Sequence, residues 1–160
     1  MRLVIAAVGR RKNAPEATLI DDYAARIRAG GRAVGFSSFE IAEVESPRGM
    51  EGAARQSREA SLLAAEIPDG ARRIILDEKG KSLSSAEFAA LLGGWRDQGA
   101  PATAFVIGGT DGHIDSIRSG ADRVLAFGPA TWPHMLVRAM LCEQIYRAMT
   151  ILAGHPYHRA

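Results

Sequence analysis

Short apolar runs, each the length of one β-strand, alternate along the chain with stretches that have the periodicity of helices. The first run, residues 2–9, is apolar almost throughout, which is typical of a strand that is buried on both faces. The other predicted strands are residues 33–45, 72–77, 103–107 and 123–127. Strands of this kind alternating with helices indicate a mostly parallel sheet with helices on both faces. The predicted fold class is therefore α/β.

The stretches between the strands carry helix signals. Predicted helices cover residues 16–29, 49–67, 86–96, 111–119 and 133–153. Ser84 and Ser85 with Glu87 begin the third helix in the manner of a capping box, and Pro133 stands in the first turn of the last. That last helix has apolar residues on more than one face, more than one contact with a sheet needs. We therefore expect a homodimer with a two-fold interface along this helix.

Composition limits the class of protein. No linker or repeat divides the 160 residues, so one domain over residues 1–160 is expected. The apolar run at residues 3–8 is too short for a signal-peptide core or a membrane helix, which favours a cytoplasmic protein. A single cysteine, Cys142, excludes an intramolecular disulfide and a thiolate metal cage, and the four histidines offer little for a metal site. We therefore expect no metal and no membrane contact.

The charge balance is less decisive. Twenty basic residues stand against 18 acidic ones, which gives a net charge of +2 and an isoelectric point near 9.0. Only three of the basic residues are lysines, and arginine suits bidentate recognition of phosphates and bases. A GC-rich genome produces the same bias, so charge alone leaves a nucleic-acid partner open.

Three loops follow consecutive predicted strands, at residues 76–81, 108–112 and 127–134. Ligands of parallel sheets bind at the carboxyl ends of the strands, so these loops are expected to form one pocket wall. Gly108, Gly109 and Gly112 match neither the dinucleotide fingerprint nor a phosphate loop. Read alone, they are equally well explained as a tight turn before a helix.

The C-terminus is the most unusual segment. After the long helix the chain ends in GHPYHRA, with two histidines, a tyrosine and an arginine that can stack on bases, bind phosphate and exchange protons. A helix C-cap, with glycine after the last turn and histidines near the negative end of the dipole, is the alternative interpretation. His134, in the first turn of the long helix, is more simply a structural histidine, and Cys142 is more simply a small buried hydrophobe.

Five motifs in order carry a resemblance to a known family: LDEKGK at 76–81, IGGTDG at 107–112, WPHMLVR at 132–138, EQIYR at 143–147 and HPYHR at 155–159. With this set the chain resembles the ribosomal RNA large-subunit pseudouridine N3-methyltransferases of the SPOUT superfamily, from the first strand to the last residue. Two departures are mild. Thr110 and Asp111 stand where proline or alanine with glutamate is common, and Trp132 stands where a smaller apolar residue is frequent.

The resemblance implies a SPOUT-type fold with a C-terminal trefoil knot, an exception to the rule that chains do not thread loops. It also implies S-adenosyl-L-methionine as cofactor, held in the knot loops by main chain and apolar surface. The cofactor-binding residues carried over by position are Leu76, Gly108, Phe127, Gly128, Pro129, Ala130, Thr131 and Trp132.

The implied reaction is methylation of N3 of a pseudouridine in a helix-loop of 23S rRNA, at the subunit interface of the ribosome. Tyr157, His158 and Arg159 are the implied catalytic residues, with His158 handling the acceptor proton and Arg159 holding the base or its anion. The resemblance also implies a homodimer in which the tail of one subunit completes the site of the other.

Two rival functions remain open on the residues alone. One is a non-catalytic nucleotide- or RNA-binding α/β module. The other is a Rossmann-type oxidoreductase, against which stands the single glycine, Gly9, after the first strand, where a dinucleotide fingerprint needs three.

Overall fold

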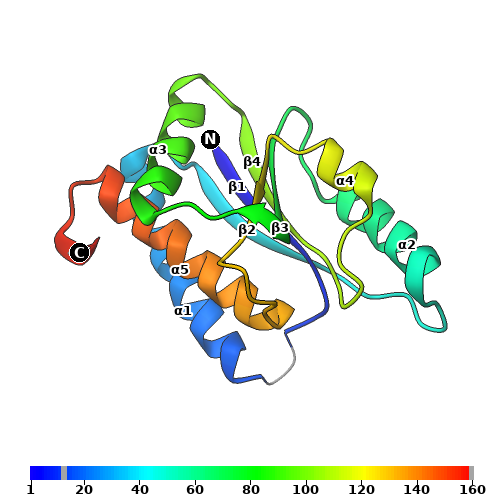
Figure 1. Ribbon diagram of the computed structural model, residues 1–160. Coiled ribbons are helices and arrows are strands. Elements are labelled where there is room, and N and C mark those ends of the chain that lie inside the picture. Colours follow the sequence, from blue (N-terminus) through cyan, green and yellow to red (C-terminus); the bar gives the residue numbers. More distant parts are fainter. Residues whose placement is uncertain (12–13, 159–160) are drawn as a thin grey trace.

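The computed structural model describes residues 1–11 and 14–158, the last of these by its backbone, and is shown in Figure 1. Its centre is a five-stranded sheet in the order β2-β1-β4-β3-β5, in which every pair of neighbours is parallel. The strands are β1 (Arg2–Val8), β2 (Ser38–Val44), β3 (Arg72–Lys81), β4 (Ala102–Ile107) and β5 (Arg123–Leu125). The predicted parallel α/β sheet is thus confirmed.

Helices cover both faces of the sheet, as Figure 1 shows. One face carries α1 (Pro15–Gly30), α3 (Ser85–Asp97) and α5 (His134–Leu152), and the other carries α2 (Gly52–Ala65) and α4 (Asp115–Ser119). Two short 3-10 helices, η1 (Gly31–Val34) and η2 (Pro156–His158), follow α1 and α5. The predicted capping box at the start of α3 is confirmed, because Ser84 and Glu87 bond each other's backbone N–H groups.

Alternating residues of β1 point to opposite faces. Leu3 and Ile5 join the large core cluster under α1, α3 and α5, whereas Ala6 and Val8 join a smaller cluster under α2. Each of these side chains is at most 2% exposed. Burial on both faces explains why the sequence of this strand is continuously apolar rather than alternating.

The predicted second strand began too early. Residues 31–34 form η1 instead, and Gly35 has a left-handed backbone with φ of +81°. Val34 is buried in this 3-10 turn, so its apolar character reflects the turn that closes α1. Extended pairing with β1 begins only at Ser38.

Other boundaries also differ from the prediction, and the second helix spans Gly52–Ala65 rather than residues 49–67. The short helix predicted from residue 111 begins at Asp115, because the side chains of Asp111 and His113 are bound to neighbouring segments. The fifth strand ends at Leu125 rather than at residue 127, and the third runs on to Lys81 rather than ending at residue 77. The extension exists because Lys81 pairs with β5 after an irregularity in the register.

Gly80 lies against the backbone of β5. A Cβ atom on Gly80 would lie 2.6 Å from the carbonyl carbon of Leu125 and 2.7 Å from that of Val124. Only glycine allows two backbones to approach this closely. The C-terminal part of β3 therefore lies in direct contact with the backbone of β5, while the trefoil knot itself stays a prediction.

Candidate functional site

A cavity of about 790 Å³ opens at the carboxyl ends of β3, β4 and β5, beside the first turn of α5. Its volume falls within the usual range of small-molecule sites. The three loops predicted to form one wall all contribute to it, because parallel strands end at the same edge of the sheet.

Seven of the eight predicted cofactor residues line this cavity. They are Leu76, Gly108, Phe127, Gly128, Ala130, Thr131 and Trp132, whereas Pro129 is not among the lining residues. The loop after β5 is held in shape by its own side chains. The indole Nε1 of Trp132 donates to the carbonyl of Phe127 at 3.1 Å, and the hydroxyl of Thr131 donates to Glu78 at 2.5 Å.

The glycine loop after β4 folds around a buried histidine. The backbone N–H of Gly108 donates to Nε2 of His113 at 3.0 Å, and His113 is only 6% exposed. Burial lowers the pKa of His113, so the neutral ring remains available as an acceptor. A Cβ on Gly108 would lie 3.1 Å from this ring and 3.2 Å from the backbone of Gly112. No role was predicted for His113, which directly follows the predicted loop at residues 108–112.

Helix α2 holds the same loop from outside. Nε of Arg55 donates to Oδ2 of Asp111 at 2.6 Å, and Gln56 donates to the backbone carbonyl of Asp111. The hydrogen bond from Arg55 lowers the pKa of the Asp111 carboxyl. Asp111, one of the two departures from the family pattern, thus fixes the loop to α2.

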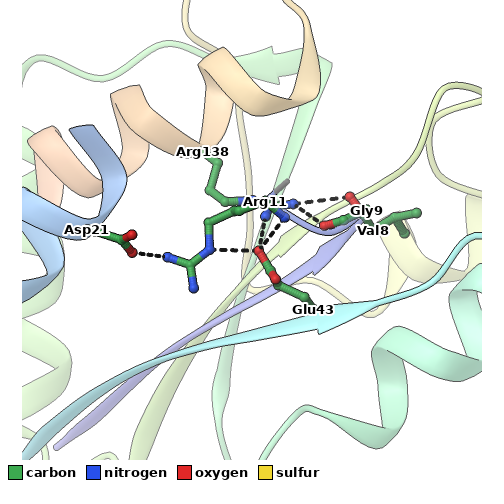
Figure 2. Close-up of polar contacts among 6 residues, drawn as sticks. All are labelled: Val8, Gly9, Arg11, Asp21, Glu43 and Arg138. Carbon is green, nitrogen blue, oxygen red and sulfur yellow. Dashed lines mark hydrogen bonds and ion pairs between the residues drawn. The ribbon is translucent and has the colours of Figure 1, made fainter. Parts of the chain in front are cut away.

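A buried arginine on α5 ties the start of this helix to the end of β1 (Figure 2). Arg138 is fully buried, and its NH1 donates to Oε1 of Glu43 at 2.6 Å. Its NH2 donates to the carbonyls of Val8 and Gly9 at 3.1 and 3.0 Å. Arg11 donates to the same Glu43 oxygen at 2.8 Å. The network sets the position of the first turns of α5, where His134 and Val137 line the cavity.

Tyr157, the one predicted catalytic residue whose side chain the structure describes, lies outside the cavity. Tyr157 packs its ring against Tyr146 with centroids 4.7 Å apart, and its hydroxyl lies 3.3 Å from that of Tyr23 and 3.4 Å from Glu143. These neighbours and burial raise the pKa of Tyr157 to about 12, with the Tyr23 hydrogen bond the largest cause. The side chain of His158 and all of Arg159 lie outside the described residues.

The cavity and Tyr157 lie at opposite ends of α5. His134, the first residue of α5, lines the cavity, whereas Tyr157 lies beyond the last turn of α5. Nineteen residues at 1.5 Å per residue give this helix a length of roughly 28 Å. The structure therefore brings the cofactor residues together but does not bring Tyr157 to them within one chain.

Apolar surface remains uncovered near the cavity. Trp132 is 43% exposed and Leu136 is 36% exposed, on the N-terminal side of α5. By contrast Leu141, Ile145 and Met149 on the same helix are buried in the core. Only part of the apolar surplus predicted for this helix is therefore available to a partner.

The part of the chain that the structure describes contains neither a helix that could span a membrane nor a cluster of side chains that could hold a metal ion. None of its helices combines the length and the hydropathy that crossing a bilayer requires. Within the same residues, no three side chains of histidine, cysteine, aspartate or glutamate gather in a way that could hold a metal ion.

Fold and site together define an α/β protein with a small-molecule pocket made of glycine-rich and apolar loops at the carboxyl edge of a parallel sheet. A family described as "Predicted SPOUT methyltransferase" matches residues 1–158. The chain belongs to this SPOUT methyltransferase family, as the resemblance predicted, and is therefore an enzyme that transfers methyl groups.

Two relatives illustrate the match over the full length. The Ribosomal RNA large subunit methyltransferase H of Rhodopseudomonas palustris (strain HaA2) is 53% identical over 160 residues, which cover 100% of both chains. The protein of the same name from Paracoccus denitrificans (strain Pd 1222) is 58% identical over 159 residues, 99% of each chain.

Proposed function

We propose that this chain methylates N3 of a pseudouridine in 23S rRNA with S-adenosyl-L-methionine as donor, acting as a homodimer on ribosomes in the cytoplasm. The name shared by its relatives supports ribosomal RNA as the substrate. The motifs quoted from the sequence support pseudouridine as the acceptor. The observation that carries the proposal is the convergence of seven predicted cofactor residues on one cavity.

The cavity fits the donor in shape and in chemistry. Gly108 lines the cavity, and a Cβ at this position would press on His113 and Gly112, so the loop keeps this shape only with glycine there. Leu76 and the loop from Phe127 to Trp132 supply apolar walls and main-chain groups for an adenine. When bound, S-adenosyl-L-methionine supplies a methyl group that its sulfonium has already activated for nucleophilic attack.

The protein's main tasks are then to align the acceptor and to remove one proton. N3 of pseudouridine becomes a nucleophile when its proton leaves, and His158 is assigned as the group that accepts or relays this proton. The freed electron pair forms the N–C bond, while the pair of the broken S–C bond stays on sulfur. Arg159 is assigned to the developing negative charge on the base. Tyr157, with a pKa of about 12, keeps its proton and serves to orient the tail or the base.

A homodimer gives the tail a route to the cavity. Within one chain the two lie at opposite ends of α5, about 28 Å apart along the helix. A second copy that packs antiparallel along α5 would bring its own tail to the cavity of the first. The exposed Trp132 and Leu136 lie beside the cavity and supply apolar surface for such a contact.

Two measurements test the proposal. Isothermal titration should give heat of binding with S-adenosyl-L-methionine and none with NAD. Methyl transfer should then be followed by mass spectrometry on naked 23S rRNA, isolated large subunits and whole ribosomes. A protein that binds the donor but methylates none of the three substrates would favour the non-catalytic binding module.

A further inference from the structure

A buried carboxylate lies directly behind the glycine loop of the cavity. Glu59 of α2 is 2% exposed, although glutamate is rarely buried to this extent. Its Oε2 and Oε1 lie 2.7 and 2.8 Å from the position that a Cβ on Gly109 would occupy. Gly109 itself lines the cavity. The backbone of this glycine therefore lies in contact with the carboxylate and also forms part of the cavity wall.

The carboxylate is incompletely paired. Oε1 accepts a hydrogen bond from the hydroxyl of Ser46 at 2.6 Å, but Oε2 is buried without a hydrogen-bond partner among the described residues. Arg55, one helical turn earlier, forms its ion pair with Asp111 and attracts Glu59 only as a weaker, secondary partner. None of the ion pairs formed by the described residues includes Glu59. A buried charge in this condition is costly unless a positive group comes close to it.

We propose that Glu59 is a specificity-determining residue that selects a cationic ligand in this cavity. The inference rests on the proposed function, in which the donor carries a positive sulfonium and the product is a neutral thioether. The two ligands have nearly the same shape, so backbone and apolar walls bind both alike. A fixed negative charge behind Gly109 stabilises the bound sulfonium of the donor. It gives no such stabilisation to the product, whose sulfur is neutral once the methyl group has left. Glu59 thereby favours exchange of product for fresh donor.

The effect of Glu59 reaches the cavity by a second route. His134 lines the cavity, and the charge of Glu59 acts to raise its pKa, although burial and Arg138 lower that pKa overall. This direction is the one expected of a negative charge near the cavity wall. A unit charge about 8–10 Å from a cation, at an effective dielectric constant of about 20, changes a binding constant by roughly tenfold or more.

The test replaces Glu59 by glutamine, which keeps the shape and an oxygen for Ser46 but removes the charge. Dissociation constants are measured by calorimetry for S-adenosylmethionine and for S-adenosylhomocysteine, the thioether. We expect the first to weaken by about tenfold and the second to change less than twofold. The unliganded Glu59→Gln protein should unfold at the same temperature as the wild type or higher, because the unpaired charge is gone.

Controls separate charge from structure. Glu66→Gln removes an equal charge from an exposed position just after α2 and should leave both constants unchanged. Glu59→Asp keeps the charge and should keep the preference for the donor.

Three results would overturn the proposal. They are an equal change for both ligands, an unchanged ratio, and an unliganded Glu59→Gln protein that is less stable or does not fold. If the wild type itself does not bind S-adenosylmethionine, the proposed function fails as well, which distinguishes the two failures.

Discussion

Replacing Arg138 by methionine removes the charge that links α5, β1 and Glu43 but keeps most of the apolar stem. In the native protein this guanidinium donates to Glu43 and to the carbonyls of Val8 and Gly9, with no exposure to solvent. Methionine supplies none of these donors. Among the described residues Glu43 then keeps only Arg11 as an ion-pair partner, and both carbonyls lose the partner that Arg138 gave them.

The expected cost is large because the partners stay buried. Breaking one side of a buried ion pair costs about 3–5 kcal/mol, and each buried carbonyl without a partner adds about 1–3 kcal/mol. Glu43 is 20% exposed, so water recovers part of this loss. We therefore expect the free energy of unfolding to fall by about 3–5 kcal/mol, a large share of the roughly 5–15 kcal/mol that a domain has.

The assay is urea denaturation at one fixed protein concentration, since a dimer unfolds in a concentration-dependent way. With a slope of about 2 kcal/mol per molar urea, the midpoint should fall by about 1.5–2.5 M. Arg10→Met is the matched control, because Arg10 pairs with Glu45 at 3.0 Å while both side chains are mostly exposed. Its midpoint should hardly move. An Arg138→Met midpoint within error of the wild type would refute the reasoning.

Three further predictions concern single residues. Burial lowers the pKa of His113 below the ordinary 6.5, so its ring is neutral in the folded protein at pH 6.5 and above. Stability and donor affinity should both fall as the pH drops below 6.5, because the ring must then take up a proton. Calorimetry should show this loss in the wild type and not in His113→Gln, whose amide oxygen accepts the same hydrogen bond from Gly108. Gly108→Val should abolish S-adenosylmethionine binding, because the new side chain would press on His113 and Gly112 and distort the wall of the cavity, yet it should leave a folded dimer by light scattering. Unchanged affinity would place the donor elsewhere. Cys142 is buried and burial raises its pKa to about 12, so iodoacetamide should modify it only after unfolding, and rapid labelling of the native protein would contradict this.

The strands that could be predicted were those whose composition indicates burial on both faces of the sheet. Residues 2–9 and 103–107 are apolar on both faces, and each became a central strand of the sheet. The second strand was misplaced because Val34 and Phe36 alternate as in a strand, while the turn depends on the left-handed backbone of Gly35. Periodicity does not distinguish a core residue in a 3-10 turn from one in a strand.

The site was predictable to the extent that it consists of loops after parallel strands. The polar residues beneath these loops were not. Glu59, His113 and Arg138 are buried by contacts with segments far away in the sequence or across a loop, and nothing in their own neighbourhood marks them. Arg138 follows Val137 in an apolar helix and has the local pattern of an exposed arginine. Its burial depends on Glu43 and on the end of β1, which only the fold brings together.

Complementation between two defective chains tests the composite site most directly. One chain carries Gly108→Val and keeps its tail, and the other ends after Pro156 and keeps its cavity. Each homodimer should fail to methylate ribosomes, whereas a mixture of co-expressed chains should recover about a quarter of wild-type activity. Half of the randomly paired dimers are mixed, and each has one complete site. Full activity of the truncated homodimer, or no recovery in the mixture, would contradict a site shared between the cavity of one subunit and the tail of the other.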